Sequence, residues 1–79
     1  MKLHKYRVSV IGDNDEYVNV IKEFIVIADS YESAMKAAGD CDEVQSLRLS
    51  KVVATKKMVA AIRNEGYYLV SQNDTPHFL

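Results

Sequence analysis

The fold of this chain is decided at residues 23–38, which read EFIVIADSYESAMKAA. The first part, residues 24–27, is an unbroken apolar run, as expected of a strand that is covered on one side and flanked on the other. Asp29 and Glu32 then have the spacing of a capping box, with Ser30 as a competing N-cap. The stretch therefore predicts a strand that leads directly into a short, capped helix.

Further strand and helix patterns lie on both sides of this unit. Turn-forming residues at 12–15 separate two alternating stretches and predict a hairpin, and Lys22–Glu23 interrupts the second stretch, which indicates a bulge. Thr55 and Gly66 have the places of an N-cap and a helix stop, although residues 44–64 could instead form one long hairpin. We expect strands near residues 4–11, 19–28, 45–53 and 67–71, and helices near 30–38 and 56–65.

These elements predict a small α+β domain. Their order, ββαβαβ, suits an antiparallel sheet with one or two helices packed on one face. A chain of 79 residues has room for one core, so we assign a single domain to residues 1–71 and a polar tail to residues 72–79, with disorder as an alternative for the tail.

The alternation of apolar residues also predicts the core. Tyr6 and Tyr31 have core-facing positions, whereas only one of the adjacent pair Tyr67 and Tyr68 can face the core. The other residues that we expect to be mostly buried are Val8, Val10, Phe24, Val26, Ala34, Met35, Leu47, Leu49, Ile62 and Leu69.

Charge is segregated along the chain. Residues 12–43 hold nine acids and two lysines, whereas residues 44–64 hold five bases and no acid. The formal net charge of −1 therefore conceals a molecule with two poles. Such asymmetry bears on partners and not on fold.

The sequence offers no recognisable catalytic or metal-binding set. Cys41 has no histidine near it in the sequence, and no paired histidines or cysteines have zinc-ligand spacing. Residues 13–15 resemble the start of a calcium loop but lack its glycine and its distal glutamate. We therefore expect no enzymatic activity, no cofactor and no metal.

Composition predicts a cytoplasmic protein without a membrane segment. No apolar run approaches the ~18 residues that a transmembrane helix needs. A single cysteine cannot form an internal disulfide, which a small secreted domain would usually require.

The basic side chains are the first candidate contact set: Arg48, Lys51, Lys56, Lys57 and Arg63. Lys56 and Lys57 fall in the first turn of the predicted second helix, where the helix dipole disfavours cations by roughly 0.3–1 kcal/mol each. That cost marks either an anion site or a solvated helix start. Arg48 and Lys51 are an odd number of residues apart, so they face opposite sides unless a bulge intervenes. No aromatic residue lies between Val44 and Gly66 to support single-strand binding.

The acidic side chains are the second candidate contact set: Asp13, Asp15, Glu16, Asp40, Asp42 and Glu43. If the hairpin tip and the loop after the first helix converge, they could mimic nucleic-acid phosphates or dock onto a basic protein; otherwise they serve solubility. Tyr68 is added as a contact residue, since tyrosine is enriched at interfaces.

Residues 23–38, with the preceding hairpin, resemble a strand-to-helix unit of small phage and mobile-element proteins. The pattern is an apolar strand, then Ala28-Asp29-Ser30, then a helix with Glu32 and Ala34 at fixed offsets. It is similar to DpnD/PcfM-like domains and to the small host RNA polymerase inhibitor of T7-like phages. The resemblance implies a non-enzymatic phage protein, some relatives of which block a host enzyme or a CRISPR complex by binding it.

Three functions follow as expectations. The first is a non-catalytic, phage-encoded inhibitor or modulator of a host protein or protein–nucleic-acid complex. The second is direct nucleic-acid binding through Arg48, Lys51, Lys56 and Lys57. The third is a homodimeric structural or accessory protein, suggested by the apolar run at residues 24–27.

Overall fold

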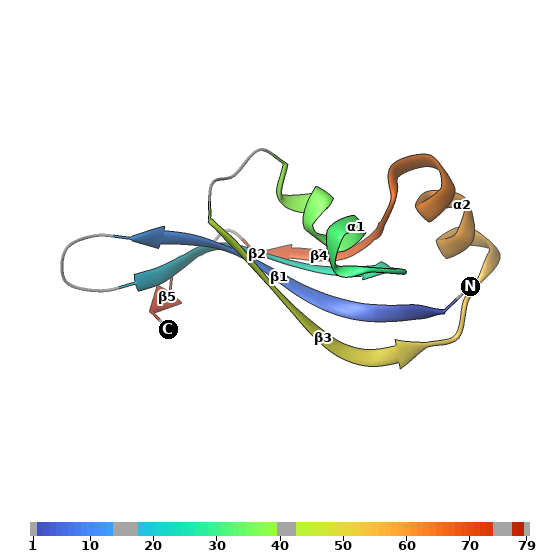
Figure 1. Ribbon diagram of the computed structural model, residues 1–79, viewed down its shortest axis with the longest axis horizontal. Coiled ribbons are helices and arrows are strands. Elements are labelled where there is room, and N and C mark those ends of the chain that lie inside the picture. Colours follow the sequence, from blue (N-terminus) through green and yellow to red (C-terminus); the bar gives the residue numbers. More distant parts are fainter. Residues whose placement is uncertain (1, 14–17, 40–42, 74–76, 79) are drawn as a thin grey trace.

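The computed structural model describes residues 2–13, 18–39, 43–73 and 77–78, and it shows an antiparallel sheet with two helices (Figure 1). The predicted α+β class and the positions of the main elements are confirmed. The strands are β1 (Leu3–Asp13), β2 (Val18–Ala28), β3 (Val44–Val52), β4 (Tyr68–Asn73) and β5 (His77–Phe78). The helices are α1 (Tyr31–Met35), the 3-10 turn η1 (Lys36–Ala38) that extends it, and α2 (Lys56–Glu65).

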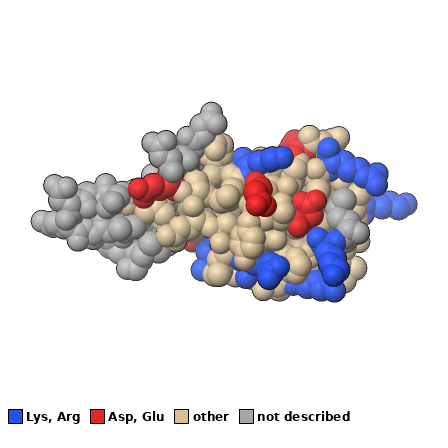
Figure 2. All heavy atoms as spheres, viewed as in Figure 1, with Lys and Arg blue, Asp and Glu red and all other residues tan. Residues whose placement is uncertain are grey.

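The strand order is β3-β1-β2-β4, so the predicted hairpin of β1 and β2 forms the centre of the sheet and β3 lies at one edge. The molecule is elongated, measuring 44 by 22 by 18 Å. β3 runs along one long side and α2 lies at one end; Lys and Arg side chains gather over both (Figure 1, Figure 2).

The assignment of residues 72–79 to a separate tail needs correction. Gln72 and Asn73 belong to β4, where they pair with Phe24 and Glu23 of β2. Further along, His77 pairs with Val20 as part of β5. The polar sequence hides these strands because an edge strand needs few apolar side chains.

Both helices begin at a capping side chain. Ser30 is the N-cap of α1, since its hydroxyl accepts a 3.1 Å hydrogen bond from the Ser33 amide; the Asp29–Glu32 capping box is therefore the wrong alternative. Thr55 caps α2 in the same way through the amide of Met58, at 3.3 Å. Gly66 ends α2 with φ +95°, a conformation that favours glycine. The region after β3 is thus a helix, and the long-hairpin alternative is wrong.

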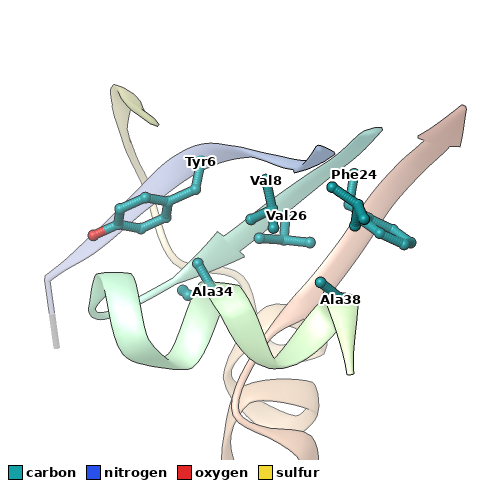
Figure 3. Packing of buried hydrophobic residues seen from close by; sticks show 8 residues of the cluster. Tyr6, Val8, Phe24, Val26, Ala34 and Ala38 are labelled. Atoms are coloured by element: carbon teal, nitrogen blue, oxygen red, sulfur yellow. The ribbon is translucent and has the colours of Figure 1, made fainter. Parts of the chain in front are cut away.

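A first core lies between the sheet and α1 with η1 (Figure 3). Ala34 and Ala38, from α1 and η1, pack onto side chains of β1 and β2 that share one face of the sheet. Small alanines let this short helix approach the sheet closely. The buried strand residues are Tyr6, Val8, Val10, Phe24, Val26 and Ala28.

A second, smaller core lies under α2. Ile62 packs with Leu3 and Ile27, and Met58, Val52 and Tyr68 partly cover them. Ile27 follows Val26 directly in β2, so the two side chains point to opposite faces of the sheet. The helices are therefore divided: α1 covers one face, as predicted, and α2 contacts the other.

Several predicted core residues are wrong because the sheet is covered over only part of its area. Leu47, Leu49 and Leu69 are 54%, 41% and 45% exposed, and all three lie on edge strands. Tyr31 is 42% exposed, whereas Tyr6 is buried, and Met35 is only half-buried. Tyr67 packs against the first core and Tyr68 against the second, so the adjacent tyrosines serve both faces.

Candidate functional site

A β-bulge places Arg48 and Lys51 on the same face of the sheet. In the pairing of β1 with β3, Tyr6 lies opposite Arg48 and His4 lies opposite Lys51, so Leu49 and Ser50 face the single residue Lys5. The extra residue cancels the odd spacing that would otherwise send the two bases to opposite sides. The sequence allowed Arg48 and Lys51 to share a face only if a bulge lay between them, and the structure has that bulge.

Aromatic side chains from β1 and α1 lie on the same face, and one of them contacts Arg48. The guanidinium carbon of Arg48 lies 5.9 Å from the ring centroid of Tyr31, within cation–π range. Tyr31 meets Tyr6 edge-on at 5.2 Å, and Tyr6 meets His4 at 6.4 Å. We call this set the aromatic–basic cluster: His4, Tyr6, Tyr31, Arg48 and Lys51. It could not be found by scanning residues 44–66 for aromatics, since its rings come from other elements.

The cluster changes the acidity of its buried phenol. Burial raises the pKa of Tyr6 above its ordinary value of 10.0, because the low-dielectric core disfavours the phenolate. The positive charge of Arg48 works against this rise. Three negative or ionisable neighbours add to it: Tyr31, Asp29 and Glu32. Tyr6 therefore stays neutral at physiological pH and serves as a packing residue.

The opposite face of β3 is open and carries two exposed leucines, Leu47 and Leu49. Leu47 pairs with Arg7, and Gln45 pairs with Ser9, on the side of the sheet away from Tyr6. These residues, with Ser46, line a shallow hollow of about 460 Å³. β3 thus exposes bases on one face and leucines on the other.

The other predicted basic residues lie on α2. Lys56 and Lys57 occupy its first turn and are exposed, and Arg63 is exposed in its last turn. Lys51 is the next-to-last residue of β3 and lies only a few residues before this turn, so the bases of residues 44–64 reach from the β3 edge to the α2 end of the molecule (Figure 2).

The acidic set is only partly placed. Glu43 is exposed just before β3, and its carbonyl accepts a 2.9 Å hydrogen bond from the Ile11 amide. Asp13 is the last residue of β1. The remaining members of this set lie outside the described residues: Asp15, Glu16, Asp40 and Asp42. Tyr68 is partly buried under α2 and is not an open contact residue.

The described residues offer neither a metal cluster nor a membrane span. No three His, Cys, Asp or Glu side chains come together among them in a way that could hold a metal ion. Within the same residues, neither helix has the length and apolarity to cross a membrane.

Comparison with protein-family models, with curated proteins and with solved structures gives no match for this chain. The site must therefore be judged from its own geometry and chemistry.

Proposed function

We propose that this chain is a small non-catalytic binding protein that acts by forming a stoichiometric complex with another protein. The observation that supports the proposal is the β3 edge, where exposed bases and exposed leucines occupy opposite faces of one strand. Apolar area supplies affinity at a protein interface, while charge supplies orientation and association rate. Both are present here on one accessible element.

The partner that we favour belongs to a host nucleic-acid-processing or defence complex. This part of the proposal rests on the resemblance of residues 23–38 to phage inhibitor proteins of the polymerase-inhibitor or anti-CRISPR kind. Proteins that handle nucleic acid present both basic surfaces and the acidic residues of their catalytic sites, and a protein that carries charges of both signs complements such a surface. With a net charge of −1, the protein is less suited to a uniform polyanion, since nucleic-acid affinity comes mainly from phosphate neutralisation.

Direct nucleic-acid binding is the second candidate, and the aromatic–basic cluster favours it. Tyr31 is half-exposed beside Arg48. Single-strand binding proteins use this arrangement, in which an aromatic ring that can stack on a nucleobase lies next to a positively charged side chain. The cluster has only one such exposed ring, whereas a single-strand site needs a row of them. We therefore place this candidate behind protein binding.

The two candidates are separated by one pair of measurements. Tagged protein is incubated with nuclease-treated bacterial lysate and recovered by size exclusion, and in parallel its binding to labelled duplex DNA, single-stranded DNA and RNA is followed by anisotropy. We expect a stoichiometric protein complex that the Arg48→Glu/Lys51→Glu variant loses. The matched control is Lys22→Glu/Lys36→Glu, which makes the same charge change at exposed bases outside β3 and should retain the complex.

Sub-micromolar, salt-dependent binding to any of the nucleic acids, abolished by the same Arg48→Glu/Lys51→Glu change, would overturn the proposal in favour of the second candidate.

A further inference from the structure

We infer that the outer edge of β3 receives an extended segment of the partner protein as an added strand, and that this segment alternates acidic and apolar side chains. The inference deepens the proposed function and rests on it, because it states how a partner protein would be bound and which chemistry it would present.

The backbone of β3 has an unpaired side. β3 is the terminal strand of the order β3-β1-β2-β4, and among the described residues β1 is the only strand that pairs with it. The Ile11 amide donates to the Glu43 carbonyl, and the register then pairs Ser9 with Gln45 and Arg7 with Leu47. In an antiparallel ladder, hydrogen-bonded pairs alternate with pairs whose amides and carbonyls point away. The outward-pointing groups are therefore those of Val44, Ser46 and Arg48.

The length and composition of β3 suit strand addition. The strand has nine residues, VQSLRLSKV, without proline or glycine, and most of them are exposed. Proteins usually protect such an edge with proline, a short strand, a bulge or charged side chains. Here the protection consists of the bulge at Leu49–Ser50 and two bases, which deter only those strands that carry no complementary acid.

The charges select against a second copy of this chain as the occupant. β3 has two bases, Arg48 and Lys51, and no acid. Pairing β3 with β3 of another copy would bring the bases of both copies along one junction, where like charges opposite each other are destabilising. A segment with carboxylates on that face would instead pair with both bases.

The two faces of β3 then define the alternation in the partner. Side chains of an added strand point in turn to the two faces of the sheet. On the face of the aromatic–basic cluster they meet Arg48 and Lys51, so acidic residues fit there. On the other face they meet Leu47 and Leu49, both substantially exposed, so apolar residues fit there.

The test uses a synthetic nine-residue peptide of alternating valine and glutamate as the probe. Amide shifts of the labelled protein are followed by NMR during titration. We expect shifts concentrated at β3, and a Kd that rises roughly tenfold or more with Arg48→Glu/Lys51→Glu but not with Lys22→Glu/Lys36→Glu. Ser46→Pro removes one outward amide without altering charge, and Ser46→Ala is its matched control; only the proline should weaken binding.

A second comparison leaves the protein unchanged, so it holds even if Ser46→Pro fails to fold. A peptide that differs from the probe only in having its central valine replaced by proline cannot form a continuous ladder, and we expect its Kd to be at least roughly tenfold higher. Equal binding of the two peptides, shifts centred on α2, or no binding of either peptide would each overturn strand addition. Concentration-dependent dimerisation of the protein alone, lost in Ser46→Pro, would replace the partner by a second copy.

Failure of this inference is distinguishable from failure of the proposed function. A lysate complex that survives Ser46→Pro but is lost in Arg48→Glu/Lys51→Glu would reject strand addition and retain protein binding. Nucleic-acid binding in the anisotropy measurement would reject the proposed function itself.

Discussion

Arg48 lies over the ring of Tyr31, with its guanidinium carbon 5.9 Å from the ring centroid. The contact joins the edge strand β3 to the start of α1, which are not consecutive in the chain because η1 lies between them. It also holds the guanidinium on the face where Lys51 lies, so the geometry of the candidate surface depends on it.

The first prediction concerns this contact. Arg48→Met keeps a long side chain but removes the cation, so we expect the free energy of unfolding to fall by about 0.5–1 kcal/mol, the usual worth of an exposed cation–π pair. Lys51→Met is the control, because Lys51 has no such ring contact among the described side chains and should change stability by less than about 0.5 kcal/mol. Urea unfolding of the two variants checks this; equal losses would show that the ring contact is not stabilising.

The second prediction concerns the first core. Phe24 is 6% exposed between the sheet and η1, so Phe24→Ala should cost about 3–5 kcal/mol and can unfold a domain of this size. Leu47→Ala, at an edge position that is 54% exposed, should cost less than about 1 kcal/mol. Thermal unfolding of both variants is the measurement. A Phe24→Ala variant that melts within a degree or two of the unmodified protein would contradict the assignment of the inner face of β2.

Local sequence signals predict the elements of this fold well. Capping at Ser30 and Thr55 and the glycine stop at Gly66 are interactions within a few residues, so they can be read directly from the chain. The sequence indicated a bulge at Lys22–Glu23. In the structure the β1–β2 register shifts next to Lys22, because Val10 pairs with Lys22 whereas Ile11 pairs with Val20 and Ile21 is skipped. The helix ends could therefore be predicted because the interactions that form them join residues only a few positions apart in the sequence.

The surface of the sheet could not be predicted in the same way. Alternation shows that Leu47 and Leu49 share an apolar side of β3, but not whether a helix covers that side. Coverage depends on α2, which docks at Leu3 and Ile27 and leaves the β3 leucines exposed. The aromatic–basic cluster was missed for a related reason: its rings and bases come from three elements, and only the bulge in the β1–β3 pairing aligns them.

The third prediction is a loss of stability at alkaline pH. The pKa of Tyr6 is raised in the folded protein above its ordinary value of 10.0, so folding favours the protonated phenol. Stability from this group is then fully present below pH 10 and is lost as the pH rises from about 10 through the folded pKa. Tyr6→Phe should remove that part of the alkaline loss while changing stability little at pH 7. Urea midpoints at pH 7, 9, 10.5 and 11 check this; parallel curves for the two proteins would count against it.

The fourth prediction concerns Ser46. Its hydroxyl oxygen is buried opposite Val8 and has no hydrogen-bond partner within the described part of the chain. An unsatisfied buried hydroxyl is costly, so Ser46→Val should raise the free energy of unfolding by about 1 kcal/mol. Ser50→Val, at an exposed position of the same strand, controls for β-propensity and should give a smaller gain. If both substitutions stabilise equally, strand propensity and not the orphan hydroxyl is the cause.

The last prediction separates stability from binding at α2. Lys56 and Lys57 are exposed in the first turn, where the helix dipole disfavours cations, so Lys56→Glu/Lys57→Glu should stabilise the domain by roughly 0.3–1 kcal/mol per residue. The same change removes positive charge from the end of the molecule next to Lys51, so association with the partner recovered from lysate should slow several-fold while dissociation hardly changes.

Arg63→Glu is the matched opposite of this double reversal, because Arg63 lies in the last turn of α2, where a cation is favourable; its reversal should destabilise α2. Chemical unfolding and surface plasmon resonance give the two readouts. A double reversal that lowers stability would contradict the dipole argument. A double reversal that acts on dissociation instead of association would place Lys56 and Lys57 inside the contact itself and not beside it.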